Sequence, residues 1–224
     1  MTNWWDQQIH RAEQLIPNAN GSKELLTFYA HLLRAQRDVY ESLRRRPNWL
    51  PSGNLEADLT VLADSMPAFL RVIESHGPAT LAAEAHELYE ANAQAIAERL
   101  IAYWHNPSDI QFFEKAYLQP YLRWVAESGG RPVGREVSGG ERCCPFCGGR
   151  PQVSFLQNKE TTAESGNRDL ICGTCLSSWQ FRRVVCANCG EERPAKLATF
   201  IHRGSTIFAL KLATPASITS RVLI

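Results

Sequence analysis

The seven cysteines of this 224-residue chain all lie between residues 143 and 189, and four of them form two C-x2-C pairs. Cys144 and Cys147 are the first pair, and Cys172 and Cys175 follow after 24 intervening residues. Each pair can form a knuckle, a tight turn whose two thiolates point at one ion, and two knuckles complete the tetrahedral sulfur shell of a structural metal. We therefore expect this quartet to bind one iron or zinc ion, with Cys143 left out because Cys144 keeps the two-residue spacing.

The segments around the two pairs predict a small β module. Arg150–Leu156 and Arg168–Cys172 are the expected strands, joined by a polar loop over Lys159–Asn167. Because such a module buries little apolar area, ion binding should supply much of its folding free energy. Two alternatives stay open: the four residues are buried free thiols, or one pair is a redox dithiol, for which the second pair would be unnecessary.

A third pair, Cys186 and Cys189, repeats the first pair at an offset of 42 residues. The flanking residues repeat as well, so the module is expected to be the start of a tandem repeat. Partners for the third pair should lie near positions 214 and 217, where the chain has Thr214 and Ser217. His202 is poorly placed to substitute. The second site is therefore expected to be incomplete, and to be empty or only partly filled.

The first 128 residues contain no cysteine and show helical spacing of apolar positions. Helices are expected over 22–46, 65–76 and 79–104, with a last helix that follows Asn106 and carries Ile110. The first of them should bury a stripe made of Leu25, Phe28, Tyr29, Leu32, Val39, Tyr40 and Leu43. The run Arg44–Arg46 invites a nucleic-acid interpretation, but cations in a last helical turn also oppose the helix dipole.

A glycine- and proline-containing linker near residues 127–132 separates the two parts. The expected fold is α+β: an all-α helical bundle over 1–130, then a rubredoxin-like or zinc-ribbon metal module over 131–203. Residues 204–224 form an atypical tail. Charge divides at the same point, since residues 1–130 carry 16 acidic and 11 basic side chains and residues 131–224 carry 7 and 13.

Several functional classes fit the composition poorly. A net charge of +1 argues against a protein that owes its main affinity to many phosphate contacts. No apolar run is long enough for a membrane span, and the first residues lack the pattern of a signal peptide. We therefore expect a cytoplasmic location, where cysteines are more often metal ligands than disulfides.

The three cysteine motifs resemble those of the FdhE family of formate dehydrogenase accessory proteins. The similarity covers Cys144–Pro151, Cys172–Cys175 with the following Trp179 and Arg182–Arg183, and Cys186–Gly190. The helical half, including Leu118–Tyr121, is also similar. The resemblance implies a cytoplasmic maturation factor with two rubredoxin-like metal sites, not an enzyme. Its partner would be the catalytic subunit of respiratory formate dehydrogenase, a molybdenum-dependent enzyme exported in the folded state.

The tail departs from the family's pattern, which has a fourth C-x2-C pair. With permitted codons, Leu212–Ala213 and Pro215–Ala216 read one base earlier can each encode a cysteine. We hypothesise a frameshift just before Phe208, with an ordinary divergent tail as the alternative. Residues 204–224 are therefore expected to be a disordered or frameshifted tail, and sequencing the gene tests the frameshift.

Trp179, Phe181, Arg182 and Arg183 are candidate partner-binding residues, since aromatic and arginine side chains dominate protein interfaces. The alternative buries Trp179 and Phe181 in the module's own core. The favoured function is assembly or activation of the formate dehydrogenase catalytic subunit before export. A nucleic-acid-binding zinc ribbon is the alternative, although no nucleic acid is expected. An enzyme is not expected, because a four-cysteine shell is closed. The sequence leaves a homodimer open and does not separate iron from zinc.

Overall fold

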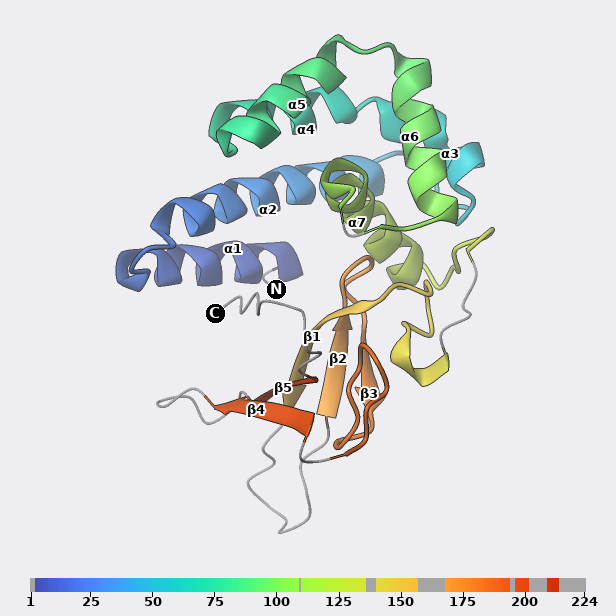
Figure 1. Ribbon diagram of the computed structural model, residues 1–224. Coiled ribbons are helices and arrows are strands. Elements are labelled where there is room, and N and C mark those ends of the chain that lie inside the picture. The colour runs from blue at the N-terminus through green and yellow to red at the C-terminus, as the bar shows by residue number, and fades with distance from the viewer. Residues whose placement is uncertain are drawn as a thin grey trace. The chain divides into compact units, whose positions relative to one another are not determined.

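The computed structural model describes residues 3–108, 110–135, 140–156, 168–193, 196–201 and 209–213. The chain divides into two compact units, residues 1–135 and 136–224 (Figure 1). The first unit is helical and the second contains the strands, so the α+β class is confirmed. No helix in the described ranges has both the length and the apolar character needed to cross a membrane.

The helical unit follows the expected pattern with two additional helices near its start. Its α-helices are α1 (Trp4–Leu15), α2 (Lys23–Arg44), α3 (Leu55–Ala63), α4 (Met66–His76), α5 (Ala79–Glu90), α6 (Ala93–His105) and α7 (Phe112–Glu127), with a short 3-10 turn at Ile16–Asn18. Large aromatic side chains fill its core, among them Trp5, Phe69, Tyr103, Tyr117 and Tyr121. Neither α1 nor α3 was predicted from the sequence.

The segment 79–104 forms two helices instead of one. Asn92 lies between them, and its side chain accepts a hydrogen bond from the Ala95 backbone N–H at 2.8 Å. This contact satisfies one of the free N–H groups at the start of α6, which is the usual role of asparagine before a helix. The interruption of the apolar stripe at Asn92 therefore marks a helix start.

Two of the expected core positions of α2 are exposed. Leu25 is 49% exposed and Tyr29 is 45% exposed, whereas Leu43, 18 residues after Leu25 on the same side of the helix, is 1% exposed. Periodicity defines the apolar face of a helix but not how far along the helix its partners cover that face. Ile110 is a further correction: it lies before α7 and is 91% exposed.

The three arginines at the end of α2, Arg44–Arg46, each contact another residue of the helical unit. The Arg44 guanidinium lies 5.3 Å from the centre of the Trp124 ring. Arg45 pairs with Glu41, and Arg46 pairs with Asp64. These contacts agree with the structural interpretation of the run and leave little support for a phosphate-binding role.

The predicted linker is partly attached to the helical unit. Val133 donates its backbone N–H to the Gly53 carbonyl at 2.8 Å, and its own carbonyl accepts from the Trp104 indole at 2.8 Å. Arg135 lies over the Trp104 ring, 5.0 Å from the ring centre. Because of these contacts the first unit extends to residue 135, five residues beyond the expected boundary.

Helices α2 and α4 meet at a pair of stacked histidines. The rings of His31 and His76 lie 3.7 Å apart at an interplanar angle of 8°. Burial lowers the pKa of His31 below 6.5, and the charges of His76 and Arg34 lower it further. The unfolded chain therefore takes up this proton before the folded chain does, so protonation favours unfolding.

We accordingly expect the free energy of unfolding of the helical unit to fall as pH drops below about 6.5. Replacing His31 with glutamine should reduce the change of the free energy of unfolding with pH, because it removes the group whose pKa differs between the folded and unfolded states. Denaturant titrations followed by circular dichroism at pH 7.5 and 5.5 measure the effect. His10→Gln, an exposed histidine on α1, is the control. The prediction would be contradicted if the free energy of unfolding changed equally between pH 7.5 and 5.5 in His31→Gln and in the native chain.

The second unit is built on an antiparallel meander. Its strands are β1 (Pro151–Leu156), β2 (Arg168–Cys172) and β3 (Ser178–Phe181), paired in the order β1-β2-β3. The first two strands lie where they were expected, and the register pairs Pro151 with Cys172. The start of β1 therefore lies beside the end of β2. The predicted loop over Lys159–Asn167 falls outside the described residues.

A second antiparallel pair joins β4 (Leu197–Ile201) to β5 (Ala209–Ala213). The pairing runs from Leu197 opposite Ala213 to Ile201 opposite Ala209. Residues 209–213 are thus in a strand whose backbone pairs with β4, and the character of the tail over 204–224 stays a prediction. The positions of Thr214, Ser217 and His202 lie outside the described residues, and the frameshift remains a prediction.

Candidate metal centre

The register of the meander explains why two distant cysteine pairs meet. Cys144 and Cys147 lie in the turn just before β1, after a short 3-10 turn at Gly140–Arg142, and Cys172 ends β2. Because the start of β1 pairs with the end of β2, both knuckles lie at one end of the hairpin. The Gly173 N–H donates to the Arg150 carbonyl at 2.9 Å and ties the knuckles together.

The first knuckle is closed by two backbone hydrogen bonds. The Cys144 N–H donates to the Gly149 carbonyl at 2.9 Å, and the Gly148 N–H donates to the Cys144 carbonyl at 2.9 Å. Gly148 has a φ of 70°, a conformation that glycine adopts at little cost. In the second knuckle Leu176 takes the corresponding conformation with a φ of 62°, and the Cys172 N–H donates to the Ser177 carbonyl at 2.9 Å.

The four sulfurs form a compact buried cluster. They belong to Cys144, Cys147, Cys172 and Cys175 and lie within 4.8 Å of one another. The Sγ atoms of Cys144 and Cys175 are 3.6 Å apart, and those of Cys147 and Cys172 are 3.5 Å apart. A tetrahedron with metal–sulfur bonds of about 2.3 Å has sulfur–sulfur edges of about 3.8 Å. The cluster could therefore hold one metal ion after small shifts of the sulfurs.

The electrostatics of the cluster favour a bound cation. Hydrogen bonds from the neighbouring thiols, that of Cys144 first, lower the pKa of Cys172. The corresponding interactions raise the pKa of Cys147 and of Cys175, again with Cys144 as the first cause. Four buried thiolates without a cation would repel one another, and an ion removes this repulsion as it displaces the protons. Two backbone N–H groups, of Thr174 and Cys175, also point at Cys172 Sγ at 3.3 and 3.5 Å.

Gly149 is a residue whose role the sequence analysis did not identify. A Cβ atom at this position would lie 2.7 Å from Thr174 Oγ1 and 2.9 Å from Cys172 Sγ. Real Cβ atoms do not approach other atoms this closely, so a side chain here would displace the sulfur. The absent side chain allows the two knuckles to approach each other.

We expect Gly149→Ala to weaken metal binding by about 10- to 100-fold, the range seen when groups that position metal ligands are altered. Competition with a chromophoric chelator measures the affinity. The exposed neighbour provides the control, since Arg150→Ala should leave the affinity unchanged. An unchanged affinity in Gly149→Ala would show that the knuckles tolerate the added carbon.

The other three cysteines differ in burial. Cys143 is partly buried, Cys186 is buried and Cys189 is exposed. Among the residues that the structure describes, these three belong to no group of three or more candidate ligands. The structure thus brings the predicted quartet together, and the expectation of an incomplete second site at Cys186 and Cys189 stays a prediction.

The candidate contact residues divide between surface and core. Phe181 is only 8% exposed and packs with Leu170 and Val185, so the prediction that it contacts a partner is wrong. It belongs to the small apolar core of the ribbon, as the alternative interpretation had it. Trp179 is partly buried against the same core, and its indole donates to the Glu141 carbonyl at 3.0 Å.

Both arginines of this group are exposed. Arg182 pairs with Glu141 at 3.1 Å and with Glu192 at 2.8 Å. Arg183 is exposed, and the neighbouring Val184 is 42% exposed. The exposed residues of this group that a partner could contact are therefore Arg182, Arg183 and the neighbouring Val184, with Trp179 partly exposed beside them.

Arg168 is a second residue that the sequence analysis missed. Its guanidinium donates to Ser154 Oγ at 2.6 Å and to the Arg182 carbonyl at 3.2 Å, and it also bonds to the Val185 carbonyl. Only 2% of the residue is exposed. Burial lowers the pKa of Arg168, and the nearby Cys186 opposes this shift. Arg168 thus fixes the segment that leads from β3 to the third cysteine pair.

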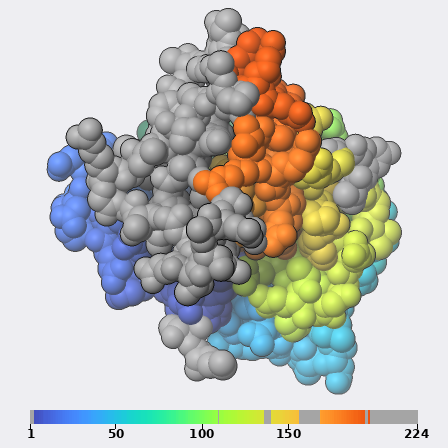
Figure 2. All heavy atoms as spheres, turned by 90° about the horizontal axis from the view of Figure 1, so that it is seen from below, coloured from blue at the N-terminus to red at the C-terminus, as the bar shows by residue number. Residues whose placement is uncertain are grey.

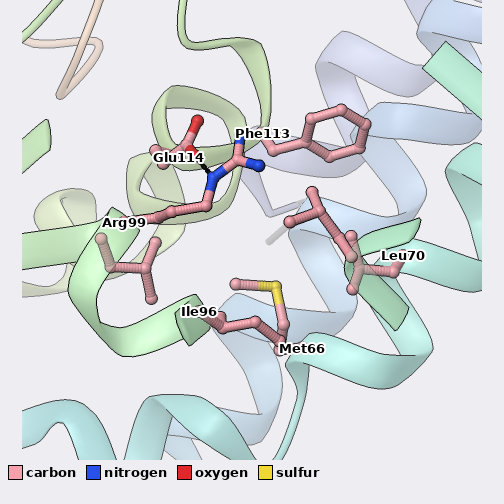
Figure 3. Close-up of a pocket in the computed structure, with 8 residues that line it drawn as sticks. Met66, Leu70, Ile96, Arg99, Phe113 and Glu114 are labelled. Atoms are coloured by element: carbon pink, nitrogen blue, oxygen red, sulfur yellow. Dashed lines mark hydrogen bonds and ion pairs between the residues drawn. The ribbon is translucent and has the colours of Figure 1, made fainter. Parts of the chain in front are cut away.

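A small pocket in the helical unit is a weaker candidate site. Arg99 and Glu114 form its polar side, with the Arg99 Nε 2.5 Å from a Glu114 carboxylate oxygen, while Met66, Leu70 and Ile96 lie opposite (Figure 3). Arg99 also pairs with Glu84 at 3.1 Å. Its charge is therefore balanced within the protein, and the remaining wall is apolar.

Comparisons with known proteins agree with this site. Residues 143–183, which contain the complete quartet, match the family model described as FdhE, central domain. A protein named FdhE homolog from Aquifex aeolicus is 25% identical over 197 residues, covering 80% of this chain and 68% of that protein. A second FdhE homolog, from Shewanella oneidensis, is 32% identical over 60 residues, which are 27% of this chain and 19% of that protein.

The fold agrees with a solved structure. The crystal structure of the FdhE protein from Pseudomonas aeruginosa matches with a TM-score of 0.57 and 19% sequence identity, covering 93% of this chain and 82% of that chain. The cysteine-rich segment of this chain is thus similar to the FdhE central domain, the chain is similar in sequence to FdhE homologs, and its fold is similar to that of a solved FdhE protein.

Proposed function

We propose that this protein is a cytoplasmic accessory factor that binds the catalytic subunit of a formate dehydrogenase and assists its assembly or activation before export. The observation that carries the proposal is the four-cysteine cluster within the segment that matches the FdhE central domain. The protein would act by binding rather than by turnover, since four thiolates leave a bound ion no open position for a substrate.

The metal would have a structural role in this function. The sheet has three short strands, and its core cluster consists of Leu170, Phe181 and Val185 with Trp179 and Ala187 packed against it. An ion held by the quartet would join the first and second knuckles and so fix β3 and the surface around Trp179 and Arg183. When bound, the ion supplies folding free energy, and an iron ion could in addition carry one electron.

The alternative of a nucleic-acid-binding ribbon receives little support. Arg182 lies between two carboxylates, and each arginine of the run that ends α2 has a partner within the helical unit. Nucleic-acid binding normally depends on several unpaired cations along one surface.

Affinity capture tests the proposed function. The tagged full chain is expressed in formate-grown cells of the organism that encodes it, and co-purifying proteins are identified by mass spectrometry. We expect the formate dehydrogenase catalytic subunit to be enriched, and the amount captured to fall in an Arg183→Glu variant, which reverses an exposed charge. An exposed site on the helical unit, Arg71→Glu, gives the matched control. Absence of any molybdoenzyme subunit, with nucleic acid in its place, would refute the proposal.

A further inference from the structure

The segment that follows α7 is held on the helical unit through its backbone. Val133 uses both of its backbone groups, since its N–H donates to the Gly53 carbonyl and its carbonyl accepts from the Trp104 indole, each at 2.8 Å. Val133 itself is 54% exposed. Figure 2 shows the cyan atoms of the segment at the start of α3 next to the yellow-green atoms at the end of the helical unit. Residues 131–135, which we call the strap, are therefore bound as an extended peptide is bound, by main-chain hydrogen bonds.

The surface that receives the strap is fixed by buried groups. The Asp58 carboxylate, which is 4% exposed, accepts from the Ser52 N–H at 2.8 Å and from the Tyr121 hydroxyl at 2.7 Å. These bonds hold the loop that carries Gly53. A Cβ atom on Gly53 would lie 2.1 Å from the Arg131 carbonyl oxygen, so a side chain here would push the strap away.

The end of the strap adds two contacts to those of Val133. The His105 ring donates to the Gly134 carbonyl at 3.2 Å, and the Arg135 guanidinium lies 5.0 Å from the centre of the Trp104 ring. Single hydrogen bonds and a cation–π contact stabilise a segment much less than a buried apolar core stabilises the helices. The strap can therefore open while the helical unit stays folded.

The strap determines how much chain connects the two units. The Gly130 N–H donates to the Val125 carbonyl at 3.0 Å, which attaches the start of this segment to α7. The first described turn of the second unit begins at Gly140. With the strap bound, the connection runs from Arg135 to Gly140 and spans at most about 18 Å. With the strap released, it runs from Gly130 and spans at most about 36 Å.

We propose that the strap is a releasable latch. Bound at Gly53 and Trp104, it keeps the metal module on a short connecting chain, and its release doubles the length of that chain while the helical unit stays folded. Local openings of this kind are populated without any ligand, and a partner that occupied the same two groups would shift the equilibrium toward the released state. The latch does not depend on the proposed function, because it involves only residues of the helical unit.

Limited trypsin digestion of the zinc-loaded full chain tests the proposal. Arg131 precedes a proline and resists trypsin, whereas the bond after Arg135 becomes accessible when the strap leaves Trp104. We expect Gly53→Ala to release the fragment 1–135 about 10-fold faster than the native chain, because the added carbon displaces the strap. Gly21→Ala is the matched control. Its φ of 78° is close to the 77° of Gly53, but no atom lies within 4 Å of its Cβ position, so its rate should stay within about twofold.

Hydrogen exchange at increasing urea concentration, resolved by NMR, separates release of the strap from unfolding. The Val133 amide should exchange with little dependence on urea and the amides of α7 with a strong one, because local opening exposes little surface. Trp104→Phe removes the indole N–H and should speed exchange of the Val133 amide by about 5- to 10-fold. Tyr117→Phe removes a buried hydroxyl that contacts Ser65 and should leave this rate unchanged.

Small-angle X-ray scattering of the same samples measures the length of the connection. Gly53→Ala should have a larger radius of gyration than Gly21→Ala. Three results would overturn the proposal. They are a Val133 amide that exchanges only on global unfolding, equal cleavage rates in the two alanine variants, and equal radii of gyration despite faster cleavage. If Gly53→Ala loses the protection of α7, Trp104→Phe is compared with Tyr117→Phe by the same three criteria.

Discussion

Replacing both Cys172 and Cys175 with serine should abolish metal binding at the quartet and unfold the β1-β2-β3 meander. The two residues supply half of the sulfur shell, and both are almost completely buried. Structural zinc contributes about 10–16 kcal/mol to the folding of small zinc-finger peptides, far more than three short strands supply alone. We expect the ion of the quartet to be lost, and the protected amides of β2 to exchange freely with solvent.

The measurement is hydrogen exchange by mass spectrometry, with elemental analysis of the same samples. The helical unit has its own core, so peptides from α2 and α7 should keep their protection. Cys143→Ser is the control, because Cys143 lies outside the quartet. A double variant that lacks the ion and still protects β2 would show that the module folds without metal, in agreement with the buried-thiol alternative.

The second large effect is expected at Arg168. Replacing it with methionine keeps the length of the side chain but removes the bonds to Ser154 and to the carbonyls of Arg182 and Val185. A buried acceptor left without a partner costs about 1–3 kcal/mol, so we expect a total loss of about 3 kcal/mol in the free energy of unfolding of this unit. Hydrogen exchange of β2 in the metal-loaded full chain measures the change.

Two further variants separate charge from geometry at this position. Lysine keeps the positive charge but lacks the planar fork of donors, so Arg168→Lys should recover only part of the loss. Arg150→Met, at an exposed position in the same unit, should change the free energy of unfolding by less than about 0.5 kcal/mol. Full stability in Arg168→Met would mean that solvent or other donors satisfy the carbonyls.

The sequence predicted those features that depend on spacing alone. The positions of Cys144, Cys147, Cys172 and Cys175 sufficed to group the four sulfurs, because a knuckle is a local structure and a ribbon joins two of them. Strands β1 and β2 were predicted for the same reason. The helical faces of α2 and α4 follow from the 3.6-residue period, which is also local.

Features that depend on contacts between distant residues could not be predicted in this way. Arg168 begins a short strand after a polar stretch of sequence, where an arginine is usually exposed, yet it is buried and bonded to Ser154 of β1 and to the segment after β3. Leu25 lies on the apolar face of α2, but the elements that pack on this face do not extend as far as Leu25. No sequence pattern indicated the role of Gly149, because this residue leaves room for Cys172 and Thr174, which lie more than twenty residues away in the chain.

X-ray absorption spectroscopy at the metal edge of the purified full chain tests the central claim most directly, with Cys189→Ser included so that the quartet alone is observed. The sulfur cluster predicts one ion per chain with four sulfur neighbours at about 2.3 Å and no nitrogen or oxygen ligand. A chain that is folded without an ion, or an ion coordinated mainly by nitrogen and oxygen, would contradict the account.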